Sequence, residues 1–414
     1  MTPYFQTDLG KLYHGDCLEV MKEILNNSIS AILTDPPYGL KFMGKSWDHG
    51  VPGVPFWTEA LRISKPGAHL LAFGGTRTHH RLMCAIEDAG WEIRDTLGWI
   101  YGSGFPKSLD VSKAIDKEEG AKRPIVGKAM MHTPTRNGCF DDDAYDWGEK
   151  YQPVTAPATP AACLWSGYGT ALKPAWEPVI LARKPLDGTV AQNVQKWGCG
   201  ALNVDGCRIE GKAWKRDTPW RDNIKGGNLV KGQVKREPCD PRHSHQLGRF
   251  PANLILDEEA AALLDEQSGV LTSGNNPSKR SADKHRAVYA GWKGEQCLVR
   301  RPTNSGYASR FFYCAKASRS ERGKGNNHPT VKPRALIRYL LKLISAPTGG
   351  IVLDMFAGSG TVPLECERAG RKWIAIEKEK ASCEIIKKRI ETFEWGETEP
   401  GQERLFPMTQ EALL

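Results

Sequence analysis

The segment from Ile351 to Glu377 constrains the fold more than any other part of the chain. It reads IVLDMFAGSGTVPLECERAGRKWIAIE, in which a short apolar run enters a glycine-rich turn, a helical pattern follows, and a second apolar run ends at an acid. This order of strand, turn, helix and strand is typical of a parallel α/β sheet. Helical patterns at residues 334–344 and up to about residue 390 frame this βαβ unit.

The N-terminal part repeats the alternation of strand and helix. Short apolar, β-rich runs at residues 11–14, 31–33 and 69–73 alternate with helical patterns around residues 18–25 and 56–63. This rhythm also indicates a parallel α/β sheet.

The middle of the chain differs in composition and periodicity. An apolar strand at residues 178–182 follows an interruption at about residues 101–172, which we expect to be an insertion with large loops. Residues 184–326 are polar, basic and glycine-rich, with scattered tryptophans and tyrosines and without sustained helical periodicity. We therefore expect a separate recognition unit here.

The net charge of +9 is unevenly distributed. Residues 271–334 hold fourteen Lys or Arg and three acids, which favours a polyanion as partner over a merely solvated basic face. No run of eighteen apolar residues occurs, the N-terminus lacks a secretory signal, and none of the eleven cysteines forms a CxxC pair. We therefore expect a cytoplasmic protein with reduced thiols and no membrane partner.

The glycine-rich turn has the properties of a ligand loop. Gly358 and Gly360 allow a tight turn and a close approach to the backbone, and the following helix start offers unpaired N–H groups. Glu377, at the end of the second strand, can accept hydrogen bonds from the two ribose hydroxyls of a nucleoside. Pro363 stands where a dinucleotide fingerprint has its third glycine, so a dinucleotide is disfavoured.

A second motif, Asp35-Pro36-Pro37-Tyr38, follows the apolar strand at residues 31–33. The prolines stiffen the backbone and hold the Asp35 carboxylate and neighbouring carbonyls outward as acceptors. Acceptors that bind both N–H groups of an aromatic amine localise its lone pair for attack on a methyl group. Tyr38 supplies a stacking face for a base. The alternative is a proline-stiffened surface turn.

TDPPYGL and DMFAGSGTV, in this order and separated by a basic region, resemble the amino-methylating (N6-adenine/N4-cytosine) site-specific DNA methyltransferases, specifically the β group. LYHGDCLEVM, HPTVKP, GRFPANLILD and SRFFYCAKASRSERG are similar to further segments of phage and bacterial members. The resemblance implies an α/β, Rossmann-like, S-adenosylmethionine-dependent methyltransferase sheet assembled from both chain ends. It divides the chain into a catalytic part (1–184), a target-recognition region (185–326), a cofactor-binding part (327–394) and a tail (395–414).

The resemblance also assigns site residues. Asp35, Pro36, Pro37 and Tyr38 would hold the target base, Asp16 the cofactor adenine, Glu377 the ribose, and Thr330 with Lys332 the methionine carboxylate. The remaining cofactor-binding residues would be Asp354, Phe356, Gly358 and Gly360, with Asp35 shared between the two ligands.

The implied reaction is site-specific methylation of adenine N6 in double-stranded DNA, by base flipping and direct in-line attack, without a metal. It would take place in a bacterial or phage-infected host cell. A homodimer and a cognate restriction endonuclease are partners that the sequence leaves open, as it does the recognition sequence. Phosphate contacts from the basic stretch predict salt-dependent binding.

Several alternatives stay open. Cytosine N4 suits the same acceptors, and protein or RNA methylation and a non-catalytic DNA-binding module are further readings. Cytosine C5 methylation would need the thiolate of Cys239, which lies in the basic region rather than after a strand. A zinc knuckle would draw on an irregularly spaced group: Cys199, Cys207, Cys239, His243 and His245.

Overall fold

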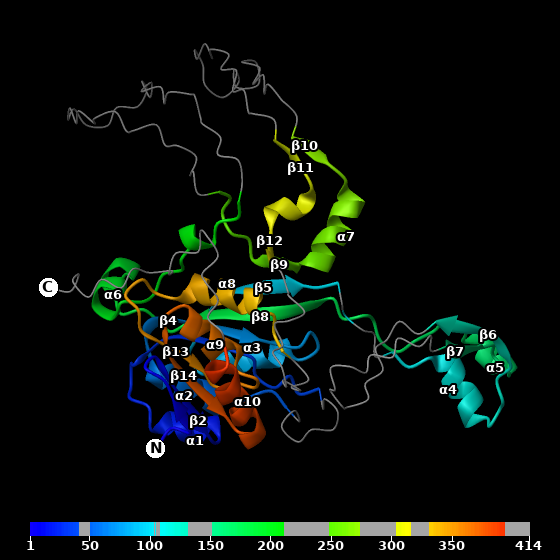
Figure 1. Cartoon of the computed structure of the whole chain (residues 1–414), viewed down its shortest axis with the longest axis horizontal. Coiled ribbons are helices and arrows are strands. Elements are labelled where there is room, and N and C mark those ends of the chain that lie inside the picture. Colours follow the sequence, from blue (N-terminus) through cyan, green and yellow to red (C-terminus); the bar gives the residue numbers. More distant parts are fainter. Residues whose placement is uncertain are drawn as a thin grey trace, which may run out of the picture. The chain divides into compact units, whose positions relative to one another are not determined.

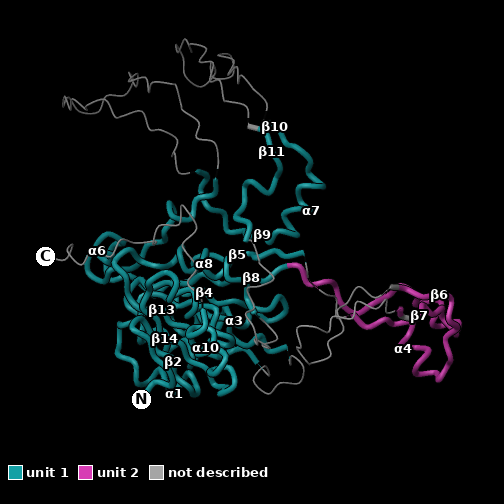
Figure 2. The backbone as a smooth tube through the Cα atoms, viewed as in Figure 1, with its two compact units in different colours: residues 1–102, 176–414 teal, residues 103–175 magenta. Residues whose placement is uncertain are grey.

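The computed structural model describes residues 1–40, 50–102, 104, 108–130, 151–210, 248–273, 304–315 and 331–393. The chain forms two compact units, one of residues 1–102 and 176–414 and the other of residues 103–175 (Figure 2). The functional division into four parts stays a prediction. The expected insertion at about residues 101–172 falls largely within the second unit.

Ten strands of the described residues form one sheet in the larger unit, in the order β1-β2-β14-β13-β3-β4-β8-β5-β9-β12 (Figure 1). They are β1 (Phe5–Gln6), β2 (Gly10–His14), β3 (Ile29–Thr34), β4 (Ser64–Phe73), β5 (Glu92–Ile100), β8 (Trp176–Arg183), β9 (Leu254–Asp257), β12 (Tyr313–Ala315), β13 (Ile351–Asp354) and β14 (Lys372–Glu377). The neighbours from β2 to β4 are all parallel, whereas β8 is antiparallel to both β4 and β5. The expected α/β class is confirmed, but the sheet is mixed.

The two ends of the chain meet in the centre of this sheet. Strand β13 pairs with β3 on one side, with Leu353 opposite Ile32, and with β14 on the other. Strand β14 in turn pairs with β2, with Glu377 opposite His14. The predicted assembly of the sheet from both chain ends is therefore confirmed, and the carboxyl ends of four neighbouring parallel strands share one edge.

Helices cover both faces of the sheet (Figure 1). They are α1 (Cys17–Lys22), α2 (Val54–Ile63) and α3 (His79–Asp88) on one face, and α8 (Arg334–Ile344), α9 (Thr361–Arg368) and α10 (Lys380–Glu391) on the other. In β4, Leu71 and Phe73 pack in the cluster with α8, whereas Leu70 and Ala72 pack in the cluster with α1, α2 and α3. Because both faces are buried, the central strands are apolar at almost every position rather than alternating.

The described part of the middle region adds strands to the main sheet, and the separate recognition unit stays a prediction. Strands β9 and β12 extend the main sheet beyond β5, with α7 (Glu258–Ser268) between them in the chain. The strands β10 (Leu271–Ser273) and β11 (Asn304–Gly306), which pair antiparallel with each other, also lie between them in the chain, and α6 (Val190–Trp197) packs near β4. Strands β9 and β12 are only four and three residues long, so they leave almost no periodic signal. No helix among the described residues is long and apolar enough to cross a bilayer.

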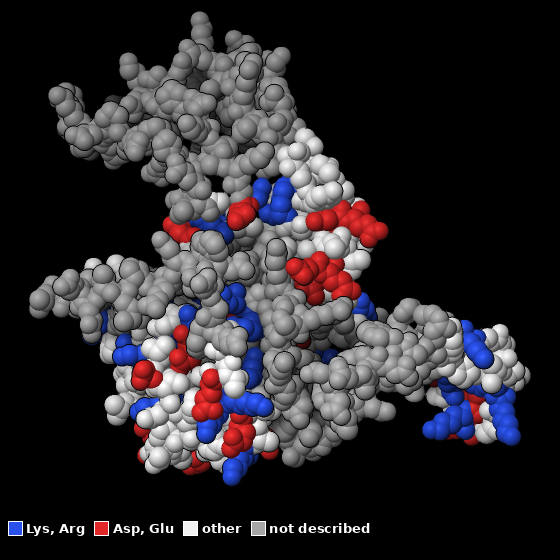
Figure 3. Space-filling view, in the orientation of Figure 1, with Lys and Arg blue, Asp and Glu red and all other residues white. Residues whose placement is uncertain are grey.

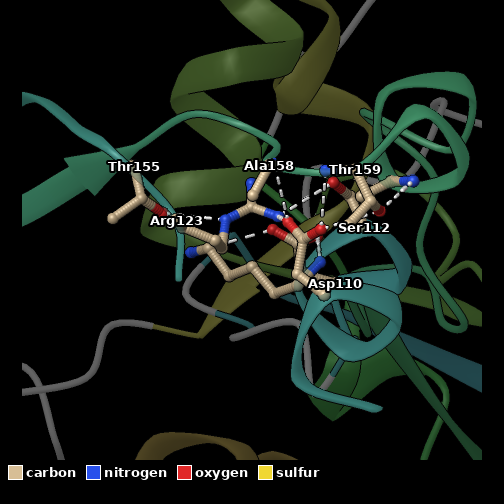
Figure 4. A network of polar contacts seen from close by, with 9 residues as sticks. Asp110, Ser112, Arg123, Thr155, Ala158 and Thr159 are labelled. Atoms are coloured by element: carbon tan, nitrogen blue, oxygen red, sulfur yellow. Dashed lines mark hydrogen bonds and ion pairs between the residues drawn. The ribbon is translucent and has the colours of Figure 1, made fainter. Parts of the chain in front are cut away.

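The smaller unit contains a network of polar contacts around the buried carboxylate of Asp116, and Figure 4 labels its partners Arg123, Ala158 and Thr159. It contains α4 (Val111–Glu118), β6 (Ile125–Met130), β7 (Tyr151–Thr155) and α5 (Pro160–Leu164). Asp116 accepts hydrogen bonds from the backbone N–H groups of Ala158 and Thr159, at 3.0 and 3.1 Å, and pairs with Arg123. Arg123 also donates to Thr155 and Ser112. Polar contacts thus organise a unit too small for a large apolar core.

Candidate active site

Four carboxylates stand at the carboxyl ends of the four central parallel strands. Asp16 follows β2, Glu377 ends β14, Asp354 ends β13, and Asp35 follows β3. In open α/β sheets, ligands bind outside this edge. The structure therefore brings acids that are up to 361 positions apart in the sequence to one edge of the sheet.

The glycine-rich loop wraps the carboxylate of Glu377. The backbone N–H of Gly358 donates to one carboxylate oxygen at 2.7 Å, and the N–H of Glu379 donates to the other at 2.8 Å. Burial raises the pKa of Glu377, although these N–H groups work in the opposite direction. Gly358 and Gly360 have φ values of 53° and 77°, in the left-handed region that favours glycine.

Asp16 begins α1 and lies beside the end of β14. Its carboxylate accepts a hydrogen bond from the backbone N–H of Leu18 at 3.0 Å, which caps the helix. The other carboxylate oxygen lies 3.2 Å from the ammonium of Lys378. The backbone N–H of Gly15 donates to the carbonyl of Glu377, which ties the two predicted cofactor acids to each other.

Asp354 is buried between the two motifs. Its carboxyl accepts a hydrogen bond from the Thr34 hydroxyl at 2.8 Å and another from the backbone N–H of Phe356 at 3.2 Å. Burial raises the pKa of Asp354 to about 7 against these hydrogen bonds, and the charges of Asp35 and Glu377 add to the rise. Asp354 thus links the strand that precedes Asp35 to the loop that contains Phe356.

Asp35 belongs to a compact polar cluster. Its carboxylate lies 2.9 Å from the Tyr38 hydroxyl and 2.9 Å from the Lys332 ammonium. Pro36 is buried, and the carbonyl of Tyr38 accepts a hydrogen bond from the Thr78 hydroxyl at 2.6 Å, so the tetrapeptide is fixed at both ends. Burial and the nearby carboxylates raise the pKa of Tyr38 well above its usual range, which keeps the phenol protonated.

Lys332 and Glu177 complete this cluster. The Lys332 ammonium lies 3.0 Å from the Glu177 carboxylate and 2.9 Å from the Tyr38 hydroxyl, and its side chain is only 11% exposed. Burial alone would lower the pKa of Lys332, but the charges of Asp35 and Glu177 raise it above its usual range. The ammonium also lies 4.8 Å from the ring centre of Phe73.

The structure adds three residues that the sequence analysis missed. Glu177 is the second residue of β8. Trp99, its cross-strand partner in β5, packs against Tyr101 with ring centres 4.9 Å apart. Burial and the charge of Glu177 raise the pKa of Tyr101. The one available signal for Glu177 is an acid directly before the apolar run PVILA, as in WEPVILA.

The remaining predicted site residues are Lys332, Thr330 and the candidates for a metal site. The structure places Lys332 against Asp35, and its predicted contact with a methionine carboxylate stays a prediction. Thr330 lies outside the described residues, as do the predicted tail and the metal candidates Cys239, His243 and His245. Cys199 and Cys207 are buried, and burial raises the pKa of their thiols to about 11 and about 12, respectively.

Most of the basic stretch also lies outside the described residues. Its described Arg310 packs on the ring of Phe311 at 4.5 Å, and Arg249 approaches the same ring at 5.0 Å. Acidic side chains gather over α7 on the face seen in Figure 3. The described part of the recognition region therefore carries charges of both signs.

Parts of the chain are similar to known DNA methyltransferases. Residues 219–388 match a model of the N6 and N4 methyltransferases described as DNA methylase. Over 82 residues, 17% of this chain and 19% of the relative, the sequence is 40% identical to Type II methyltransferase M.BamHI of Bacillus amyloliquefaciens. Over 91 residues, 22% of this chain and 26% of the relative, it is 36% identical to Type II methyltransferase M.HpaI of Haemophilus parainfluenzae. The aligned part of the chain thus spans about a fifth to a quarter of the length of these two relatives.

Two solved structures match the chain over most of its length but at lower sequence identity. PvuII DNA methyltransferase (cytosine-N4-specific) is 14% identical with a TM-score of 0.43, covering 95% of this chain and 91% of the other. The M1.HpyAVI-SAM complex is 15% identical with a TM-score of 0.37, covering 92% and 100%, respectively.

Proposed function

We propose that this chain is an amino-methylating DNA methyltransferase, which transfers a methyl group from S-adenosylmethionine to an exocyclic amine of duplex DNA; the match of residues 219–388 to the DNA methylase model supports this. The row of four carboxylates at the carboxyl ends of β2, β14, β13 and β3 carries this proposal. Such a row suits a donor with ribose hydroxyls and a cationic sulfur, and Asp35 at its end suits an amine.

The residues present fit this donor. When bound, S-adenosylmethionine supplies a methyl group on a positively charged sulfur. Each oxygen of Glu377 already accepts one backbone N–H and keeps a further lone pair for a ribose hydroxyl. Asp16 is the proposed partner of the adenine amine. The other proposed donor-binding residues are Asp354, Phe356, Gly358, Gly360, Thr330 and Lys332.

Asp35, Pro36, Pro37 and Tyr38 would hold the target base. The Asp35 carboxylate would accept an N–H of the amine, and Tyr38 would face the flipped base. The amine nitrogen would then form a bond to the methyl carbon as the carbon–sulfur bond breaks, and would afterwards lose a proton. No covalent enzyme intermediate is needed, because the amine itself is the nucleophile.

We propose adenine N6 as the target because the sequence DPPY favours adenine within the family that it resembles. Cytosine N4 is the second candidate, since Asp35 and its neighbours suit either amine. To decide between them, the full chain would be incubated with unmethylated DNA and methyl-labelled donor, and the DNA digested to nucleosides. Labelled N6-methyladenine is expected. Labelled N4-methylcytosine would contradict the base assignment, and unlabelled DNA would contradict the function.

The role of Asp35 has its own test. Asp35→Ala should slow methyl transfer by roughly 10²–10³-fold, equivalent to about 2.7–4 kcal/mol, as for other preorganised polar groups. Asp88→Ala, at an exposed carboxylate that ends α3, is the control and should keep the normal rate. Single-turnover rates with excess enzyme measure both. A rate for Asp35→Ala equal to that of the control would remove Asp35 from the reaction.

A further inference from the structure

Glu177 shares both polar partners of Asp35. Its carboxylate lies 3.1 Å from the Tyr38 hydroxyl and 3.0 Å from the Lys332 ammonium, and the corresponding distances from Asp35 are both 2.9 Å. The Glu177 side chain is 20% exposed, so it contributes its charge within a mostly buried cluster. It stands at the start of β8, between β4 and β5 in the sheet (Figure 1).

The cluster has one more carboxylate than it needs to balance its ammonium. The Lys332 ammonium has three N–H donors. It also has three acceptors, one each from Asp35, Glu177 and the Tyr38 hydroxyl. Tyr38 stays neutral and has a single hydrogen to donate. The charges of these four side chains therefore sum to −1, whereas Asp35 and Lys332 alone would form a neutral pair.

This excess charge matters for the proposed reaction. An amine that attacks a methyl group gains positive charge, which a nearby net negative charge stabilises. An ammonium 2.9 Å from Asp35 would cancel that effect if no second carboxylate were present. A structural ion pair would need only one carboxylate for the buried Lys332, so Glu177 requires a separate explanation.

We propose that Glu177 is a positioning residue for methyl transfer, which holds Lys332 and Tyr38 and leaves the negative charge of Asp35 available to the target amine. This inference rests on the proposed function. Glu177 acts through its two partners and not by contact with the base. When the target amine replaces the Lys332 ammonium beside Asp35, Glu177 remains as the counterion of Lys332.

The test begins with Glu177→Gln, which keeps the shape of the side chain and an acceptor for Tyr38 but removes the charge. We expect kcat to fall on the order of 10–100-fold, as for partners that orient a catalytic group, with little change in KM for the donor. The control is Glu92→Gln, at the other end of the same strand pair, where Glu92 pairs with Arg183 and is 40% exposed. It should leave kcat unchanged. Equal kcat values for the two variants would overturn the inference.

The double variant Glu177→Gln/Lys332→Met separates charge balance from structural support. It again leaves Asp35 as a net charge of −1. At saturating donor, which offsets a loss of donor binding through Lys332, its kcat should therefore be about tenfold above that of Glu177→Gln. A kcat at saturating donor no higher than that of the single variant would overturn the inference. If the single variant does not fold, the double variant is compared with Asp35→Ala, and a loss as large would overturn the inference. A wild-type chain that methylates no DNA would refute the proposed function instead.

Discussion

A substitution at Gly360 tests how closely the proposed donor-binding loop packs against α10. It precedes α9 with a φ of 77°, and a Cβ atom at this position would lie 2.7 Å from Cγ1 and 2.9 Å from Cγ2 of Ile386. Ile386 is completely buried on α10, so it has little room to move. Gly370, just after the same helix, has a similar φ of 64° and no heavy atom within 4 Å of the corresponding Cβ position.

The two glycines therefore separate backbone strain from steric overlap. Gly370→Ala adds only the left-handed backbone penalty, about 1–2 kcal/mol. Gly360→Ala adds the same penalty plus overpacking against Ile386, about 1–3 kcal/mol more. At roughly 1–2 °C per kcal/mol, from an unfolding entropy of about 2.1 cal/mol/K per residue in a unit of this size, the melting temperature of Gly360→Ala should lie roughly 1–6 °C below that of Gly370→Ala.

Thermal unfolding followed by circular dichroism measures this difference, and calorimetric titration with S-adenosylmethionine measures its effect on the loop. Gly360→Ala should bind the donor more weakly, because a shift of the helix start also moves the N–H of Gly358 that holds Glu377. Gly370→Ala should bind it as the wild type does. Equal melting temperatures would refute the reasoning, since they would mean that α10 gives way to the new methyl group without cost.

Two further predictions concern buried charges. Because burial raises the pKa of Asp354 to about 7, folding is favoured while this carboxyl is protonated, and the free energy of unfolding should fall as pH rises from about 4 through 7. Asp354→Asn should reduce this fall, by an amount on the order of a few kcal/mol, in urea titrations at several pH values; an unchanged pH dependence would argue against it. Glu365→Ala should cost about 3–5 kcal/mol in the same assay, because it removes the fully buried carboxylate with which Arg334 and Arg338 both pair. A cost below about 1 kcal/mol would mean that solvent reaches both guanidinium groups.

The central sheet could be predicted because its signals are local and strong. Strand β13, the turn at Gly358 and Gly360, and helix α9 each show an unambiguous pattern, and the structure has them at the expected positions. Both faces of β3 and β4 are buried, so their apolar runs are also visible in the sequence. The pairing of β3 with β13 followed from the resemblance and not from any local pattern.

The rest of the fold is encoded in contacts between distant residues. Strand β5 reads EIRDTLGWI, and several of its polar residues are exposed, so it resembles a loop until β8 pairs with it. Asp116 organises the smaller unit through partners more than forty residues away, which no periodic pattern reveals. The same holds for Glu177, because its role depends on contacts with Lys332 and Tyr38, which are distant from it in the sequence.

Different contacts stabilise the individual acids of the candidate site, and these contacts suit the acids to different roles. Backbone N–H groups hold Glu377 without neutralising it, which leaves an anionic acceptor for hydroxyls. Asp354 is buried and has a pKa raised to about 7, so its negative charge is reduced near neutral pH. Asp35 alone is held by an ammonium that a second carboxylate also binds. The site therefore keeps negative charge at two places, at Glu377, where hydroxyls would bind, and beside Asp35, where a reacting amine would become positive.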